Sequence, residues 1–311
     1  MPETMSTRQA YARALLELGE ENPNVVALDA DLSHSTMTHL FAQRFPERFF
    51  NLGLAEQNVM VIAAGLAASG KVPFVSTFAV FAAGRCFDQV RLSISHPGLG
   101  VKIVATHSGI SVGEDGVSHH AIEDLALVCA HPHFTVIVPA DGIETAQAIK
   151  AAARHPGPFY IRLSRPATPV AVPPDYRFVL GKAATLREGK EATIIAMGLM
   201  VARSLEAAEA LAKEGISCRV LNMSTLKPLD REAVCKAARE TGALVVAEEH
   251  LLHGGLGSQV AMVLAQEHPA PVAFVGLEGY AQSGKGDELL ARYGLTADHI
   301  QSAVKAVLAR K

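Results

Sequence analysis

The feature that most constrains the fold is an alternation of helical patterns with short runs rich in Val and Ile. In the first part of the chain, strand-like runs occur at Val25–Leu28, Pro73–Ser76, Lys102–Ala105, Thr135–Val138 and Phe159–Leu163. The helical patterns around them lie at Thr7–Glu20, Ala55–Ser69, Ala79–Ser95, Ala121–Ala130 and Gly142–Ala153. Because strands that alternate with helices form parallel sheets covered on both faces, we predict an α/β fold of doubly wound sheets.

A segment with four prolines and no periodicity, between Arg165 and Lys182, interrupts this alternation and is typical of a linker. The alternation then resumes, with strands expected near Thr193–Met197, Ser217–Leu221, Leu244–Ala247 and Val272–Val275 and a last helix at Ala297–Leu308. A chain of 311 residues is long for one core. We therefore predict a first domain at residues 1–170, a linker at 171–185 and a second domain at 186–311.

Composition excludes several classes of function. Hydrophobic residues make up 49% of the chain and charged residues 19%, which excludes disorder. A net charge of -3 gives no general attraction to nucleic acid or anionic lipid. No apolar run approaches the roughly 20 residues that a membrane helix needs, and the N-terminus has no secretory signal. The cysteines form no CxxC pair, so we expect a cytoplasmic protein in a reducing compartment.

Polar side chains gather where an α/β sheet places its ligands, beyond the carboxyl ends of strands. Asp31 and Ser35 follow the first strand, His107, Asp115 and His119 follow the third, and Arg165 follows the fifth. Each also has an ordinary interpretation, since Asp31 and Ser35 could cap a helix and His119 could be a surface residue.

Two imidazoles at the spacing of His131-Pro132-His133 could face one side of a strand. No third ligand is visible near them, so no metal site is predicted there.

Glu56 is an acid in the first turn of a helix that is nearly all apolar after it. The pattern alone favours an ordinary role, because carboxylates stabilise helix N-termini. Phe78 and Phe81 stand three residues apart and share a helix face. They could be core residues or a platform on which a flat heterocycle stacks.

Taken together, these segments resemble the C-terminal half of transketolase, a thiamine diphosphate enzyme, over essentially the whole chain. The segments that carry the resemblance are Gly53-Leu54-Ala55-Glu56-Gln57-Asn58, Ser76-Thr77-Phe78, Ala105-Thr106-His107, Gly113-Glu114-Asp115-Gly116-Val117-Ser118-His119, Ile161-Arg162-Leu163-Ser164-Arg165, and Glu248-Glu249-His250 with the residues up to Gly257.

The resemblance implies how the cofactor is bound. In that family one acid hydrogen-bonds a ring nitrogen of thiamine diphosphate, and Glu56 falls on this acid. Burial beside the ring is expected to keep it protonated, against the pull of the helix N-terminus. Phe78 falls on the residue that stacks on the aminopyrimidine, Phe81 on a second aromatic position, and Asp31 on a position that lines the cofactor pocket.

The resemblance also implies the substrate contacts. His107 and His119 are similar to the imidazoles near the donor and acceptor hydroxyls, and Asp115 is similar to the acid that reads a substrate hydroxyl. Arg8, Ser35 and Arg165 match the group that binds the acceptor's phosphate, for which the guanidinium fork is suited. The family's usual Pro-Thr is replaced by Val117-Ser118, which leaves the identity of the sugar phosphates open.

Full-length family members hold Mg2+ (or Ca2+) and the diphosphate through an N-terminal domain with a Gly-Asp-Gly motif, which this sequence lacks. The resemblance therefore implies one subunit of a split transketolase that transfers a two-carbon ketol unit. The partner would be an N-terminal transketolase subunit that carries the diphosphate-binding domain and the metal. An α2β2 assembly, in which this chain also pairs with itself, follows by analogy.

Three other thiamine-dependent interpretations remain open: a transketolase for modified sugars, a relative of deoxyxylulose-phosphate synthase, and the beta subunit of a 2-oxoacid dehydrogenase. His107 and the GEDGxxH segment argue against the last. A non-catalytic regulatory subunit on the same fold is the alternative of another class, since fold alone does not settle function.

Overall fold

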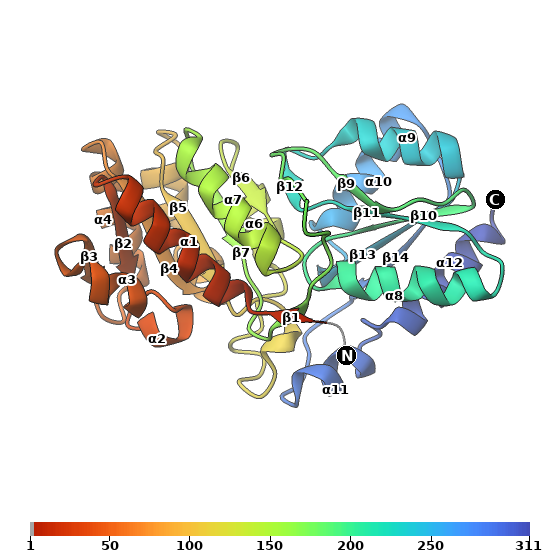
Figure 1. Ribbon diagram of the computed structural model, residues 1–311, viewed down its shortest axis with the longest axis horizontal. Helices are drawn as coiled ribbons and strands as arrows, with labels where there is room; N and C mark the ends of the chain where they lie inside the picture. The colour runs from red at the N-terminus through yellow and green to blue at the C-terminus, as the bar shows by residue number, and fades with distance from the viewer. Residues whose placement is uncertain (1–2) are drawn as a thin grey trace.

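The computed structural model describes residues 3–311 and contains two parallel-rich sheets that lie side by side (Figure 1). The first has the strand order β12-β6-β7-β5-β4-β2-β3. Its strands are β2 (Val25–Asp29), β3 (Phe49–Asn51), β4 (Val72–Phe78), β5 (Lys102–Thr106), β6 (Thr135–Ile137), β7 (Phe159–Arg162) and β12 (Thr225–Lys227). The predicted α/β class with two doubly wound sheets is confirmed.

Helices cover both faces of this first sheet. They are α1 (Thr7–Glu21), α2 (Ser33–Thr36), α3 (His39–Arg44), α4 (Glu56–Ala68), α5 (Phe87–Gln89), α6 (Asp124–Cys129) and α7 (Gly142–Arg154). Helix α1 begins where Ser6 accepts the N–H of Gln9, and it buries Tyr11 and Leu15 against the sheet. Helices α1, α3 and α7 share that core, whereas α4 and α6 pack on the opposite face.

The second sheet has the order β14-β13-β10-β11-β9. Its strands are β9 (Ala184–Arg187), β10 (Ala192–Ala196), β11 (Cys218–Asn222), β13 (Leu244–Leu251) and β14 (Val272–Leu277). Helices α8 (Met200–Lys213) and α12 (Ala297–Leu308) cover one face, while α9 (Arg231–Thr241) and α10 (Leu256–Glu267) cover the other. The elements up to β8 are called the first unit below, and those from β9 on are called the second unit. Helix α11 (Gly286–Arg292) lies near the first unit (Figure 1).

Several details differ from the sequence prediction. Strand β12 follows β11 in the chain but pairs antiparallel with β6, so a segment of the second unit completes the first sheet. Two-residue strands β1 (Thr4–Met5) and β8 (Thr168–Pro169) pair near the start of the expected linker. The helix expected at Ala79–Ser95 is broken into π-helical turns at Phe81–Arg85 and Val90–Ser95, on either side of α5.

No helix within residues 3–311 combines the length and apolar character required to cross a bilayer.

Candidate active site

The predicted site residues come together at one edge of the first sheet. Strands β7, β5, β4 and β2 are neighbours and run parallel, so their carboxyl ends lie along this edge. The loops after them carry Arg165, His107 and Asp31, and Phe78 is the last residue of β4. Four segments far apart in the sequence therefore contribute to one surface, as the sequence pattern indicates.

Glu56 is the first residue of α4 and is only 3% exposed. Its Oε1 accepts a hydrogen bond of 2.6 Å from Nη1 of Arg85, which is the last residue of the π-helical turn that follows β4. The same guanidinium lies 4.3 Å from the ring centroid of Phe81. A flat donor group thus sits between the acid and an aromatic face, so this space fits a planar ring that stacks and hydrogen-bonds.

Phe78 and His107 form the base of the site. Their rings stack with centroids 3.9 Å apart, and Phe78 is 7% exposed. The ring of His119 meets Phe81 edge-on at 5.4 Å and Phe78 at 6.0 Å. The two phenylalanines and two histidines that the sequence singles out therefore form one cluster, in which Phe81 is the more accessible aromatic face.

The imidazole of His107 is held neutral. Its backbone has φ 57°, a left-handed conformation that is unusual for a residue with a Cβ and is often found at functional sites. Burial first, and then the charges of Arg8 and Arg165, lower the pKa of His107 to about 3. Its Nδ1 lies 2.9 Å from the hydroxyl of Thr106, which fixes the orientation of the ring.

Arg8 and Arg165 line a cavity of about 370 Å3 at the edge of this cluster. Arg8 donates 2.6 Å to the carbonyl of Ser35 and 2.9 Å to that of Arg165. Nη1 of Arg165 lies 3.5 Å from a carboxylate oxygen of Asp115. Burial, together with the charge of Arg165, lowers the pKa of Arg8, as expected for two cations kept close without an anion between them.

Asp31 lies at the outer rim of the site. It is exposed, has φ 64°, and its N–H donates 3.0 Å to the side chain of Asn51. Buried Asp29 holds the loop that carries Asp31, because it accepts hydrogen bonds from the N–H of Leu32 and from the hydroxyls of Thr36 and Thr38. Burial raises the pKa of Asp29, although these hydrogen bonds oppose the effect.

Sequence reasoning missed Arg85 and Lys285, which lines the cavity with Arg8 and Arg165 from the second unit. Arg162 and Glu249 stand in segments that carry the resemblance, but the sequence assigned no role to either residue. Neither Arg85 nor Lys285 stands in a pattern that distinguishes it from a surface cation. Within residues 3–311, no three His, Cys, Asp or Glu side chains are arranged to hold a metal ion.

The arrangement of an acid at a helix start beside an aromatic face, on a doubly wound sheet, can bind a flat ring. Residues 3–170 match the family model described as transketolase, pyrimidine binding domain, and residues 181–300 match transketolase, C-terminal domain. The chain belongs to the transketolase family. This membership places it among thiamine diphosphate-dependent transferases.

Several relatives span nearly the same length, whereas the chain covers 49% of human transketolase. A putative transketolase C-terminal section from Methanocaldococcus jannaschii is 43% identical and aligns over 96% of this chain and 94% of its own. The 6-deoxy-6-sulfo-D-fructose transketolase subunit of Clostridium sp. (strain MSTE9) is also 43% identical and aligns over 98% of this chain and 95% of its own. A solved split gene transketolase, in the form of an inactive beta4 tetramer, is 53% identical with a TM-score of 0.91 over 99% of both chains.

Proposed function

We propose that this chain is the C-terminal subunit of a split transketolase, which transfers a two-carbon ketol unit from a ketose phosphate to an aldose phosphate. The observation that carries the proposal is a line of contacts from Glu56, through Arg85 and Phe81, to His119 and then through Phe78 to His107, whose pKa the nearby charges of Arg8 and Arg165 lower. It joins a place for a flat ring to a place for an anionic substrate.

The residues toward the cofactor have separate tasks. We assign ring hydrogen bonding to Glu56 and the outer rim of the pocket to Asp31. The resemblance gives stacking to Phe78 with Phe81 as a second aromatic; because Phe78 is 7% exposed and stacked on His107, we propose that Phe81 offers the more accessible face. When bound, thiamine diphosphate supplies the carbanion that carries the two-carbon unit. Arg85 must move before a ring can stack on Phe81, because its guanidinium occupies that face beside Glu56.

On the substrate side, His107 and His119 are the groups that bind and exchange protons with sugar hydroxyls. His107 remains neutral down to low pH, so its ring can hydrogen-bond a sugar hydroxyl without carrying charge, while its pKa of about 3 makes it a weak base. Asp115 hydrogen-bonds a hydroxyl of the substrate. Arg8, Ser35 and Arg165 bind the terminal phosphate of the acceptor sugar. Paired guanidinium groups suit such an anion because each presents two parallel N–H donors to its oxygens.

The partner follows from the same chemistry. The names of two relatives, a C-terminal section and a split gene transketolase, support a second chain that holds the diphosphate and Mg2+ or Ca2+. We infer an α2β2 assembly, active only with both chains, and a division of this chain into units at residues 1–170 and 186–311 joined by a linker at 171–185.

A modified sugar is the second candidate for the substrate. One relative of 43% identity is named as a subunit acting on 6-deoxy-6-sulfo-D-fructose. A sulfonate is a tetrahedral anion like phosphate, so Arg8 and Arg165 could bind either one.

The test is to purify the chain with its partner from the native host and to assay ketol transfer with thiamine diphosphate and Mg2+. Ketose phosphates, sulfo-sugars and pyruvate with an aldehyde serve as alternative donors. Glu56→Gln in the assembled complex is expected to lower kcat by about 100-fold or more.

Transfer between sugar phosphates supports the proposal, and transfer from a sulfo-sugar selects the second candidate. Products formed from pyruvate would instead indicate a synthase or dehydrogenase subunit. A complex in which Glu56→Gln changes nothing would favour the regulatory interpretation.

A further inference from the structure

A carboxylate from the second unit reaches into the loop that carries Asp115. Glu249, in β13, is 4% exposed, and its Oε1 accepts a hydrogen bond of 2.6 Å from the N–H of Ser111. Ser111 belongs to residues Gly109–Gly116, which follow β5 and are called the substrate loop below. The second unit thus contacts the backbone of the substrate loop four residues before Asp115.

The backbone of the substrate loop is shaped around this carboxylate. Gly109 has φ +74°, and a Cβ added there would lie 2.1 Å from the carboxyl carbon of Glu249. A side chain there would displace the carboxylate, and the positive φ itself favours glycine. Glu249 and the start of the substrate loop are therefore in direct contact, with no room for an intervening side chain.

Two further contacts hold the same region. Arg162, fully buried at the end of β7, pairs with Asp124 at 2.9 Å and donates to the carbonyls of Ala121 and Glu249. On the outer side, the hydroxyl of Ser283 donates 2.6 Å to the carbonyl of Glu114. The substrate loop is therefore held between β13 and the segment before α11, both of which belong to the second unit.

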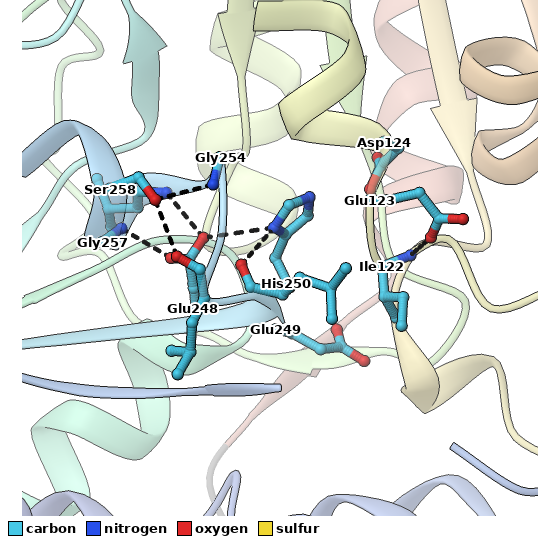
Figure 2. A network of polar contacts seen from close by, with 12 residues as sticks. Ile122, Glu123, Asp124, Glu248, Glu249, His250, Gly254, Gly257 and Ser258 are labelled. Atoms are coloured by element: carbon cyan, nitrogen blue, oxygen red, sulfur yellow. Dashed lines mark hydrogen bonds and ion pairs between the residues drawn. The ribbon is translucent and has the colours of Figure 1, made fainter. Parts of the chain in front are cut away.

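The neighbouring Glu248 makes no such contact. Its side chain points to the other side of β13, where it accepts the N–H groups of Leu256 and Gly257 at the start of α10 (Figure 2). Adjacent residues of a strand face opposite sides, so Glu248 binds amides within the second unit, whereas Glu249 binds the substrate loop. The two residues are equally buried, which makes Glu248 a matched control.

We propose that Glu249 is a positioning residue for ketol transfer, which fixes the substrate loop so that Asp115 and His119 meet the sugar in the right geometry. The proposal rests on the proposed function and gives the second unit a task within the substrate site. A displacement of about 1 Å of groups that orient a substrate can lower its rate by about 100-fold.

The experiment compares Glu249→Ala, Glu249→Gln and Glu248→Ala, each assembled with the partner subunit. We expect Glu249→Ala to lower kcat/KM for the aldose phosphate about 10- to 100-fold, mainly through KM. The Kd for thiamine diphosphate should change less than about twofold, because Glu56 and Phe81 do not touch the substrate loop. Glu249→Gln keeps an acceptor for Ser111 and should restore most of the loss, whereas Glu248→Ala should lower Tm and leave kcat/KM nearly unchanged.

Hydrogen exchange of the chain alone supplies a second readout that needs no turnover. The amide of Ser111 should exchange at least about tenfold faster in Glu249→Ala, and those of Leu256 and Gly257 should do so in Glu248→Ala. Equal losses of kcat/KM in the two alanine variants, or a Ser111 amide that stays protected, would overturn the proposal. If the wild-type complex transferred no ketol unit, the proposed function would fail, and exchange would still decide whether Glu249 holds the substrate loop.

Discussion

At the scale of single residues, Arg85 occupies the space that a flat ring would need. Its guanidinium is planar, lies over Phe81 and hydrogen-bonds Glu56, so it takes up both positions that a stacked aminopyrimidine would use. Arg85 is about half exposed, so its pair with Glu56 is worth only about 1 kcal/mol. Such a contact closes the space in the free chain and yields to a ligand that binds more tightly.

Removing Arg85 should therefore strengthen ring binding by the isolated chain. We expect Arg85→Ala to lower the Kd for thiamine about fivefold, since the ligand no longer has to break a pair of about 1 kcal/mol. Calorimetric titration with thiamine measures this. Arg44→Ala is the control, because Arg44 also lies over a phenylalanine and pairs with a glutamate, far from Glu56. Unchanged or weaker thiamine binding in Arg85→Ala would contradict the prediction.

How far the sequence predicts single residues depends on where their partners lie in the chain. Glu56 and His107 stand in local motifs, so they could be singled out before any fold was known. Arg85 and Glu249 act on residues that only the folded chain brings to them, and their local patterns resemble an ordinary surface cation and a strand acid. The sequence therefore predicted which groups face the ligand better than which groups hold them in place.

At the scale of elements, helix α7 anchors the expected linker. Asp141 caps α7 by accepting the N–H of Glu144, and its second oxygen accepts the N–H groups of Ala171 and Val172. Gln147 of α7 also accepts the N–H of Phe178. The proline-rich composition gave no sign that the carboxylate that caps α7 would also bind the linker.

Asp141→Ala should destabilise the chain more than the loss of an ordinary cap. A cap contributes about 1 kcal/mol, and two buried amides left without an acceptor bring the expected loss to about 3 kcal/mol. Urea unfolding gives this free energy, and limited proteolysis should show cleavage within residues 171–183. Thr296→Ala, at an exposed cap of α12, should cost about 1 kcal/mol and leave the linker resistant. Equal costs in the two variants would show that the linker does not depend on Asp141.

Element boundaries were predicted best where one periodicity runs without interruption. The observed bounds of α7 and α12 match the expected ones closely, because each has a side-chain cap and a regular apolar face. The expected helix at Ala79–Ser95 is broken by π-helical turns that place Phe81 and Arg85 beside Glu56. Such turns follow from tertiary contacts at functional sites, which helical periodicity does not record.

At the scale of the whole molecule, the two units share buried ionisable groups, and this makes stability depend on pH. Burial raises the pKa of Glu248 to about 7, although the N–H groups at the start of α10 oppose the effect. The charged groups that face it are His250 at 4.0 Å, whose pKa burial lowers to about 4, and the more distant Arg162.

The sign follows from proton binding. The folded chain binds the Glu248 proton more tightly than the unfolded chain, so this contribution is complete below about pH 4.5 and is lost as the pH rises through about 7. We expect Glu248→Gln to gain about 2–3 kcal/mol relative to the wild type between pH 4.5 and pH 8. Urea unfolding over this range measures the difference. The exposed Glu206→Gln is the control, and its free energy of unfolding relative to the wild type should not change with pH. If the difference for Glu248→Gln were equally independent of pH, the prediction would be contradicted.

Exposed apolar side chains lie next to the start of α4, where we expect the proposed partner subunit to bind. Leu54, Val61 and Leu92 are 79%, 44% and 53% exposed, and they lie just before α4, on α4 and on the π-helical turn packed against it. Large apolar side chains grouped on one surface are typical of interfaces. Because α4 begins at Glu56, we expect the proposed partner subunit to cover this surface.

Leu92→Asp should therefore weaken binding of the diphosphate-domain subunit about tenfold or more, because burying an unpaired carboxylate in an apolar interface is costly. The fold of the chain alone should be unaffected, since Leu92 is already in contact with water. Sedimentation of the mixed subunits gives the Kd, and Met262→Asp on α10, at 54% exposure in the second unit, is the control. If Leu92→Asp assembled as tightly as the wild type, the partner would have to approach Glu56 from another side, and the α4 surface would be left to contacts between copies of this chain.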